Sequence, residues 1–258
     1  MAVDIPPQVA SAVEDRELGA LIGRYPQAIN RILLVQCRVY GGVFGISFLG
    51  TVLGGATGGD AAAVPVAIPL LAISVWLVLL GERIKRNRAF YLYREGIVAT
   101  KSSGRIALSA RWEDLQLYWE ITRTGPNATG PLRDLYRLVA DGRTLLRHGE
   151  LRNTGPGRIM RELATAGRTP ALVRLLRSGK AVPFGPLTAT PTAGLVYRNE
   201  TLPWATIDEI GVAQDVATVS LRGRRPILIR TAKVPDILVL IHIASSAKTS
   251  PGWFSEDE

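Results

Sequence analysis

Residues 39–81 read VYGGVFGISFLGTVLGGATGGDAAAVPVAIPLLAISVWLVLLG, and this stretch decides the expected fold. Asp60 is its only charged residue, so it splits into two uncharged runs of 21 residues, 39–59 and 61–81. As helices rising about 1.5 Å per residue, each run would be roughly 31 Å long, close to the hydrocarbon thickness of a bilayer. The short turn between the runs would make the helices antiparallel neighbours. The sequence therefore predicts a transmembrane hairpin over residues 39–81.

The charges that flank the hairpin predict its orientation. The turn between the two runs carries no positive charge, whereas both outer flanks are basic. The basic residues are Arg24, Arg31 and Arg38 before the first run, and Arg83, Lys85, Arg86 and Arg88 after the second. Because positive charge favours the cytoplasmic side, we expect a multi-pass protein of the plasma membrane with both termini in the cytoplasm. The second basic cluster is then expected to contact the headgroups of membrane lipids.

The first run is rich in glycine, which predicts helix packing. Gly41 and Gly45 form one GxxxG pair, and Gly50 and Gly54 form another. The pairs are nine residues apart, about 900° of helix rotation, so they face opposite sides. We expect one face to pack on the second helix and the other to meet a second copy of the chain, giving a homo-oligomer.

Composition narrows the classes of function. The 258 residues carry a net charge of +9, with 47% hydrophobic residues and one cysteine, Cys37. One cysteine forms no intrachain disulfide, and with only two histidines we expect neither a metal site nor a cofactor. The basic residues are scattered, so nucleic acid is not an expected partner.

The remaining chain predicts an N-terminal segment and a strand-rich region. Residues 1–38 form the segment, with a helix over 8–29 that lies either on the membrane surface or on the cytoplasmic domain. From residue 89 onward, short strands and turns alternate. We expect helices at 158–166, which Gly167 would end, and at 170–179 and 235–246. We divide this region into a first unit at 89–167, a helical linker at 168–182, a second unit at 183–247 and an acidic tail at 248–258.

The two units resemble each other in sequence. In the first, Gly96-Ile97-Val98 precedes Trp112, and in the second, Gly194-Leu195-Val196 precedes Trp204. Each tryptophan lies three residues before an aliphatic residue, and each unit ends in a helix. The period of about 95 residues indicates a tandem duplication.

This order of glycine, strand, Trp-x-x-Leu/Ile strand and closing helix resembles bacterial pleckstrin-homology-like domains. With the hairpin, it resembles a group of uncharacterised actinobacterial membrane proteins. The resemblance covers residues 18–247 and implies an α+β membrane protein with tandem pleckstrin-homology-like antiparallel β units, each closed by a helix. It implies no reaction.

No catalytic motif is present, and we expect no enzymatic activity. Gly155-Pro156-Gly157 before a helix could bind an anion through backbone amides, although an ordinary helix start explains it as well. His148 and His242 have no nucleophile near them in sequence. Adjacent carboxylates at 113–114 and 208–209 point to opposite faces of a strand and share no site.

The leading hypothesis is a membrane-anchored binding or scaffolding protein whose units contact lipid headgroups or a protein partner at the inner leaflet. A basic turn in the second unit is the candidate headgroup site, made of Arg222, Arg224 and Arg225. The alternative is an accessory subunit of a membrane complex that assembles through the hairpin. An enzyme would require a spatial cluster of polar groups in a cleft, which sequence does not reveal.

Overall fold

The computed structural model describes residues 5–26, 31–58, 68–69, 71–80, 89–101, 103–123, 130–151, 155–249 and 253. It divides into two compact units. The first unit comprises Met1–Gly23, Tyr91–Val98 and Leu108–Glu258, and contains most of the strands. The second comprises Arg24–Phe90 and Ala99–Ala107, and contains the glycine-rich helix.

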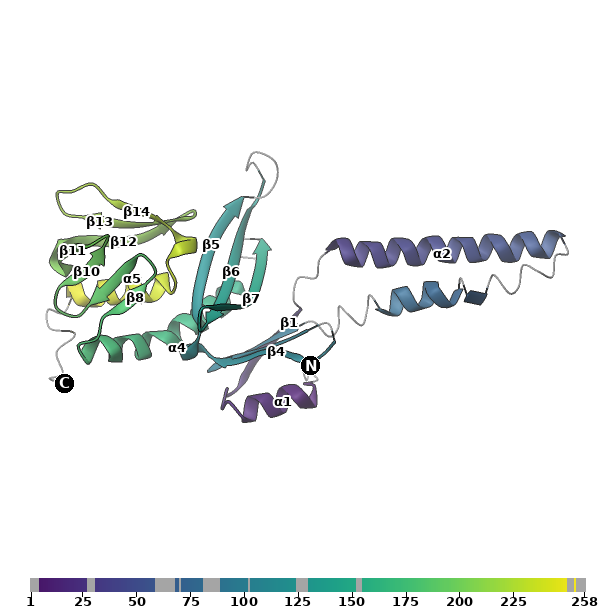
Figure 1. Ribbon diagram of the computed structural model, residues 1–258, viewed down its shortest axis with the longest axis horizontal. Helices are drawn as coiled ribbons and strands as arrows, with labels where there is room; N and C mark the ends of the chain where they lie inside the picture. The colour runs from purple at the N-terminus through teal and green to yellow at the C-terminus, as the bar shows by residue number, and fades with distance from the viewer. Residues whose placement is uncertain are drawn as a thin grey trace. The chain divides into compact units, whose positions relative to one another are not determined.

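The strand-rich part is built from two modules with the same order of elements (Figure 1). Each has a sheet of four strands, a short 3-10 turn that begins with tryptophan, a sheet of three strands and a helix. The first module consists of β1 (Leu21–Pro26), β2 (Ala89–Tyr93), β3 (Gly96–Thr100), β4 (Ile106–Arg111), η1 (Trp112–Asp114), β5 (Gln116–Arg123), β6 (Leu132–Ala140), β7 (Arg143–Leu151) and α4 (Gly157–Arg177).

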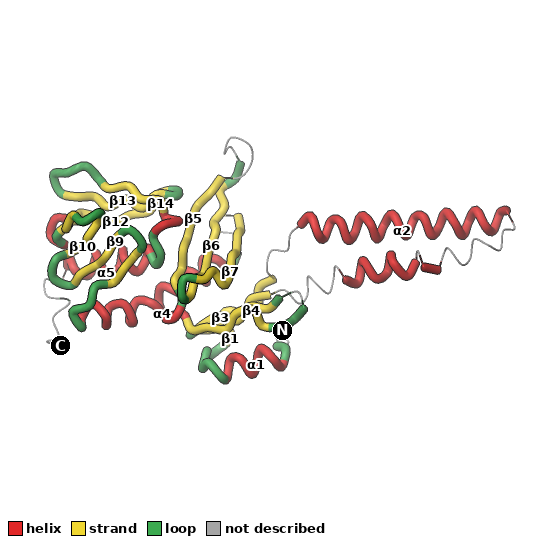
Figure 2. The backbone as a smooth tube through the Cα atoms, in the orientation of Figure 1, coloured by secondary structure: helices red, strands yellow, loops and turns green. Residues whose placement is uncertain are grey.

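The second module consists of β8 (Val182–Phe184), β9 (Leu187–Thr190), β10 (Gly194–Tyr197), β11 (Glu200–Leu202), η3 (Trp204–Thr206), β12 (Ile207–Ala213), β13 (Val216–Leu221), β14 (Ile227–Arg230), η4 (Thr231–Lys233) and α5 (Ile237–Thr249). Neighbouring strands follow chain order in all four sheets, and the strand pairs that are described in detail are antiparallel. Figure 2 shows the strands of the sheets in yellow. Apart from β1 and β2, neighbouring strands follow each other in the chain with no helix of more than one turn between them, as antiparallel hairpins allow. The remaining labelled helices are α1 (Pro7–Glu14) and α2 (Arg31–Gly58).

The two modules share a close backbone contact that requires glycine. A Cβ atom on Gly96 would lie 2.3 Å from the carbonyl oxygen of Ala110, and one on Gly194 would lie 2.0 Å from that of Leu202. Each of these carbonyls lies two residues before the tryptophan of the 3-10 turn. The indole N–H of each tryptophan donates to a backbone oxygen near the preceding strand turn, Tyr93 for Trp112 and Thr190 for Trp204. The sequence matches thus mark equivalent positions in the two modules.

Alternating burial places the core on the inner face of the three-stranded sheets. In β5, Leu117, Trp119 and Ile121 are buried, and their cross-strand partners in β6 and β7 continue the same rows. Successive residues of a strand point to opposite faces, so this alternation defines one face toward α4. The helix closes the module over this face.

No helix, as far as the structure describes it, combines the length and the apolarity that a membrane span needs. This finding overturns the predicted transmembrane hairpin at 39–59 and 61–81. The plasma membrane location and the cytoplasmic orientation of both termini are corrected with it. Absence of charge was an insufficient criterion, because residues 39–59 include eight glycines, which add length without apolar surface. In the second run, helix is described only at 68–69 and 71–80, and ten residues rise about 15 Å.

The N-terminal segment also differs from the prediction. α1 ends at Glu14, and the chain turns through Glu17 (φ 51°) and Gly19 (φ 74°) before β1 begins. β1 then joins the first sheet beside β2, although 62 residues, 27–88, separate the two strands in sequence. The first module therefore begins before the glycine-rich helix, and its predicted boundary at residue 89 was wrong.

The predicted linker helix at 168–182 does not exist as a separate element. α4 runs without interruption from Gly157 to Arg177 and includes Gly167 and Pro170. A Cβ on Gly167 would lie 2.6 Å from that of Trp112, so this glycine allows close packing of the helix on η1 instead of ending it. Of the predicted tail at 248–258, the structure describes Lys248, Thr249 and Trp253.

Gly194→Ala tests the backbone contact in the second module. Gly194 has φ +105°, and the new Cβ would collide with the Leu202 carbonyl, so we expect a loss of about 3 kcal/mol or more in unfolding free energy. Gly223 (φ +70°) is the matched control because a Cβ there meets nothing within 4 Å, and Gly223→Ala should cost about 1 kcal/mol. Urea denaturation measures both variants, and equal losses would contradict the assigned contact.

Candidate binding groove and its polar floor

The N-terminus of α4 is occupied by a carboxylate of the chain itself. The backbone N–H of Gly157 donates to Oε1 and Oε2 of Glu150, at 3.0 and 3.2 Å. Glu150 is buried and its Oε2 also lies 3.1 Å from Nε2 of His148. Helix N-termini attract anions, and here β7 supplies one. Gly155-Pro156-Gly157, for which an anion site and an ordinary helix start were the alternatives, thus has a carboxylate of the chain itself at the amide of Gly157.

A second buried carboxylate lies one strand away. Asp134 accepts a hydrogen bond from the indole N–H of Trp119 at 3.2 Å. Burial and the neighbouring Asp134 raise the pKa of Tyr136, whose phenol therefore stays protonated. Arg161 of α4 lies over the Trp119 ring, 4.3 Å from its centroid, and its positive charge opposes the rise in the pKa of Tyr136. These polar groups attach α4 to the inner face of its own sheet.

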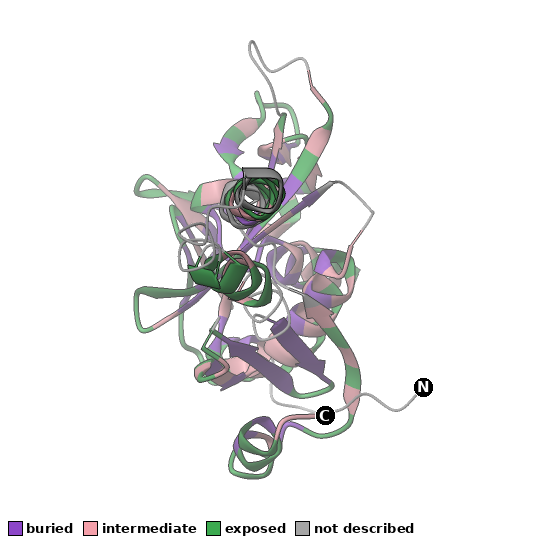
Figure 3. Cartoon of the chain, turned by 90° about the vertical axis from the view of Figure 1, so that its right-hand side faces the viewer, coloured by how far each residue is buried: buried purple, intermediate pink, exposed green. Residues whose placement is uncertain are grey.

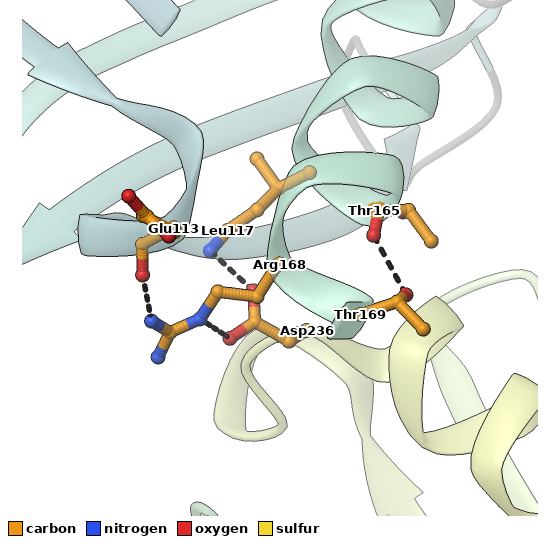
Figure 4. A network of polar contacts seen from close by, with 6 residues as sticks. All are labelled: Glu113, Leu117, Thr165, Arg168, Thr169 and Asp236. Atoms are coloured by element: carbon orange, nitrogen blue, oxygen red, sulfur yellow. Dashed lines mark hydrogen bonds and ion pairs between the residues drawn. The ribbon is translucent and has the colours of Figure 1, made fainter. Parts of the chain in front are cut away.

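Asp236 joins the two modules. It directly precedes α5 and has φ 50°, and its carboxylate points back to the first module. Oδ1 accepts the backbone N–H of Leu117 at 2.9 Å, and the N–H of Asp236 donates to the Leu117 carbonyl at 2.8 Å. Oδ2 accepts Nε of Arg168 at 3.0 Å, and Arg168 also donates to the carbonyl of Glu113 (Figure 4). One carboxylate thereby connects β5, η1, α4 and α5.

The environment of Asp236 is nearly dry. Its side chain is 5% exposed and that of Arg168 is 17% exposed. Burial raises the pKa of Asp236, while Arg168 and the Leu117 N–H act in the opposite direction. A cavity of about 10 Å³ beside it, lined in part by Trp119, Arg161 and Thr165, has room for a single water molecule.

An open groove lies between α4 and α5, next to this junction. Its volume is about 670 Å³, within the range of ligand sites in proteins. The lining from α4 is Glu162, Thr165, Ala166, Thr169 and Pro170, and the lining from α5 is Leu238, Ile241, His242 and Ser245. These residues recur at spacings of three and four, so each helix contributes one face over about two turns.

The polar groups of the groove are engaged in local contacts. The Thr169 hydroxyl donates to the Thr165 carbonyl at 2.7 Å, and Glu162 pairs with Arg158 at 3.1 Å. His242 stacks edge to face with Trp253, at 6.4 Å between ring centroids. Pro170 lacks an N–H, so the Ala166 carbonyl loses its usual helical donor at the groove. The result is a mostly apolar surface.

Arg222, Arg224 and Arg225 do not line this groove. Arg222 pairs with Asp208 at 3.5 Å, and Arg224 pairs with Glu200 at 2.7 Å, so acidic neighbours already offset two charges of the turn shared with Arg225. The predicted headgroup residues Arg83, Lys85, Arg86 and Arg88 lie outside the described residues. No group of three potential metal ligands occurs within the described part of the chain.

Two of the four glycines of α2 that were predicted to pack lie against another helix. Gly41 and Gly45 face the helix at 71–80, where a Cβ would lie 3.1 Å from Val78 and 3.4 Å from the Ser74 hydroxyl, respectively. The Ser74 hydroxyl donates to the Gly41 carbonyl at 2.7 Å. A Cβ on Gly50 would meet nothing within 4 Å, and the surroundings of Gly54 lie outside the described residues.

Sequence reasoning missed the junction residues Arg168 and Asp236. A signal for Asp236 was present, since an aspartate directly before an apolar helical run is typical of a helix start. No local signal reveals that its carboxylate bonds across 119 residues to Leu117. Arg168 falls in the predicted linker at 168–182, whereas it lies inside α4.

The chain belongs to a family of unknown function, DUF6585, whose model matches residues 6–250. No curated protein and no solved structure matches it. The match covers both modules and the region between β1 and β2.

A double-mutant cycle tests the junction. Asp236→Asn keeps an oxygen for the Leu117 N–H but removes the charge beside Arg168, and we expect a loss of about 3 kcal/mol in unfolding free energy. Arg168→Met leaves the buried carboxylate without its cation and should cost about the same. Because both changes remove the same interaction, the double variant should lose clearly less unfolding free energy than the sum of the two single losses. Additive losses in urea denaturation would show that the pair is not coupled.

Proposed function

We propose that this chain is a non-enzymatic binding protein whose working site is the groove between α4 and α5. Its occupant is an amphipathic helix of a protein partner. The observation that carries this proposal is an open, largely apolar groove at the junction of the two modules, bounded by two helices. Helices bind in such grooves through apolar residues at positions i, i+3, i+4 and i+7.

The residues of α4 favour a helix over a compact small molecule. Thr165, Ala166 and Thr169 are small, and small residues allow a third helix to approach closely, ridge into groove. The lining spans residues 162–170 of α4 and 238–245 of α5, about 12 and 11 Å, which matches about two turns of a guest helix. Glu162 at the rim is paired with Arg158, so the groove offers a guest helix mainly apolar contact.

The local contacts support binding over catalysis. His242 packs on Trp253, Glu162 pairs with Arg158, and Thr169 is bonded within α4. General acid–base chemistry needs titratable groups that converge on one reacting atom, with pKa values suited to the proton transfer. The groups lining this groove are held along its walls by separate partners.

The resemblance to bacterial pleckstrin-homology-like units remains part of this proposal. It is consistent with the four strands, three strands and closing helix of each module. Contact of Arg222, Arg224 and Arg225 with lipid headgroups is disfavoured, because Asp208 and Glu200 reduce the positive potential of that turn.

Site-specific photo-crosslinking in intact cells tests the groove. A benzophenone amino acid replaces Ala166 in the groove or, as the matched control, Arg174, an exposed residue of the same helix with a side chain 74% exposed. We expect a discrete protein adduct from position 166 and little from position 174. Ser245→Trp fills the opposite wall and should abolish the adduct while the melting temperature stays within a few degrees.

Peptide mapping of the adduct then identifies the guest segment. The proposal requires an amphipathic helix in the partner. Equal adducts at both positions, or an adduct that persists with Ser245→Trp, would contradict the groove as the site. Capture of lipid instead of protein would favour the headgroup hypothesis.

A further inference from the structure

The chain that follows α5 returns to the two helices that form the groove. α5 ends at Thr249, and four residues later Trp253 contacts both α4 and α5. The backbone oxygen of Trp253 accepts Nε of Arg177 at 3.3 Å, and the Arg177 guanidinium lies 5.8 Å from the centre of the indole ring. The same ring meets His242 edge to face, with 6.4 Å between centroids. Because His242 lines the groove, Trp253 brings this part of the chain to the edge of the groove.

The residues that follow Trp253 suit an apolar groove with a basic wall. Residues 254–258 read FSEDE, an aromatic residue followed by three carboxylates, and we call them the acidic segment. Their positions lie outside the described residues. The wall helix α4 carries five arginines and one glutamate over Gly157–Arg177, a net charge of +4. The acidic segment carries −3, so the two attract each other.

Arg177 is the cation of α4 nearest to the start of the acidic segment. It is exposed, and within the described part of the chain its side chain contacts Trp253 and no carboxylate. Arg158 at the other end of α4 is instead paired with Glu162 at 3.1 Å. Trp253 has intermediate exposure, the class drawn in pink in Figure 3. A guanidinium without an acidic partner therefore lies beside the residue that leads into three carboxylates.

We propose that the acidic segment folds back into the groove between α4 and α5 and competes there with the guest helix. Phe254 packs on the apolar wall beside His242, and the carboxylates of the segment lie near Arg177. Trp253 holds the start of the segment in place. This inference rests on the groove as the working site and adds a way in which the chain itself regulates access to it.

The length of the acidic segment matches the groove. Five extended residues span at most about 17 Å, whereas the walls at 162–170 and 238–245 are about 12 and 11 Å long. Because the segment is attached to α5 by a short connection, its local concentration at the groove is on the order of millimolar. A guest helix therefore binds more weakly while the segment is in place, and release of the segment raises its affinity.

Photo-crosslinking within the purified full chain tests the position of the segment. A benzophenone amino acid replaces Ala166 in the groove or, as the matched control, Arg143, an exposed residue that does not line the groove. Trypsin then yields peptides 162–168 and 249–258. We expect mass spectrometry to find these two peptides joined, about ten times more often than a link from position 143 to 249–258.

Two variants separate the apolar contact from the charge. Phe254→Ser should lower the link from position 166 about tenfold, because it removes a buried aromatic ring. Arg177→Gln should lower it about fivefold, and about 0.5 M salt should act in the same direction because salt screens exposed charges. Arg158→Gln is the matched control on the same helix, with a side chain 68% exposed, and should leave the link unchanged. The melting temperature checks that each variant is folded.

The remaining outcomes overturn the proposal. They are no link between 162–168 and 249–258, an equal link from position 143, or a link that Phe254→Ser and Arg177→Gln leave unchanged. The adduct with a partner protein in intact cells is a separate readout, which Phe254→Ser should raise about threefold or more. A link within the chain without any partner adduct would support this inference and contradict the partner-binding function. A partner adduct that Phe254→Ser leaves unchanged would contradict the competition and leave the groove as the binding site.

Discussion

The arrangement of the strand-rich part depends on one buried carboxylate, that of Asp236. It accepts hydrogen bonds from the backbone N–H of Leu117 in the first module and from the guanidinium of Arg168. The backbone N–H of Asp236 donates to the Leu117 carbonyl. A carboxylate in so dry a place is tolerated only when its oxygens are bonded. These bonds exist only when the two modules are together, so the junction makes their association specific.

The groove follows from this junction. Asp236 holds the first turn of α5 near Arg168, and the next turns of the two helices form the groove walls. At its other end, α4 is held by Glu150 at its N-terminus and by Arg161 over Trp119. These polar contacts hold α4 in place, and its apolar wall at the groove stays available for a guest helix.

Sequence reasoning succeeded where a local backbone constraint left a local mark. Gly96 and Gly194, and the tryptophans that follow them, were recognised as matching, and they occupy the same close contacts in both modules. It failed where tertiary contact decided the outcome. The pairing of β1 with β2 spans 62 intervening residues, and Gly167 serves packing on Trp112 where a helix end was expected. The transmembrane prediction failed because it counted uncharged residues without weighing how little apolar surface glycine provides.

Hydrogen–deuterium exchange of the full chain, wild type against Asp236→Ala, tests the role of the junction most directly. If Asp236 holds the modules together, the amides of Leu117 and Leu240 lose protection in the variant. The Leu117 N–H donates to the Asp236 side chain, and the Leu240 N–H donates to the Asp236 backbone carbonyl at the start of α5. Amides in the centres of β6 and β13 should keep theirs. Unchanged protection at Leu117 and Leu240, or a uniform loss across both modules, would contradict this account.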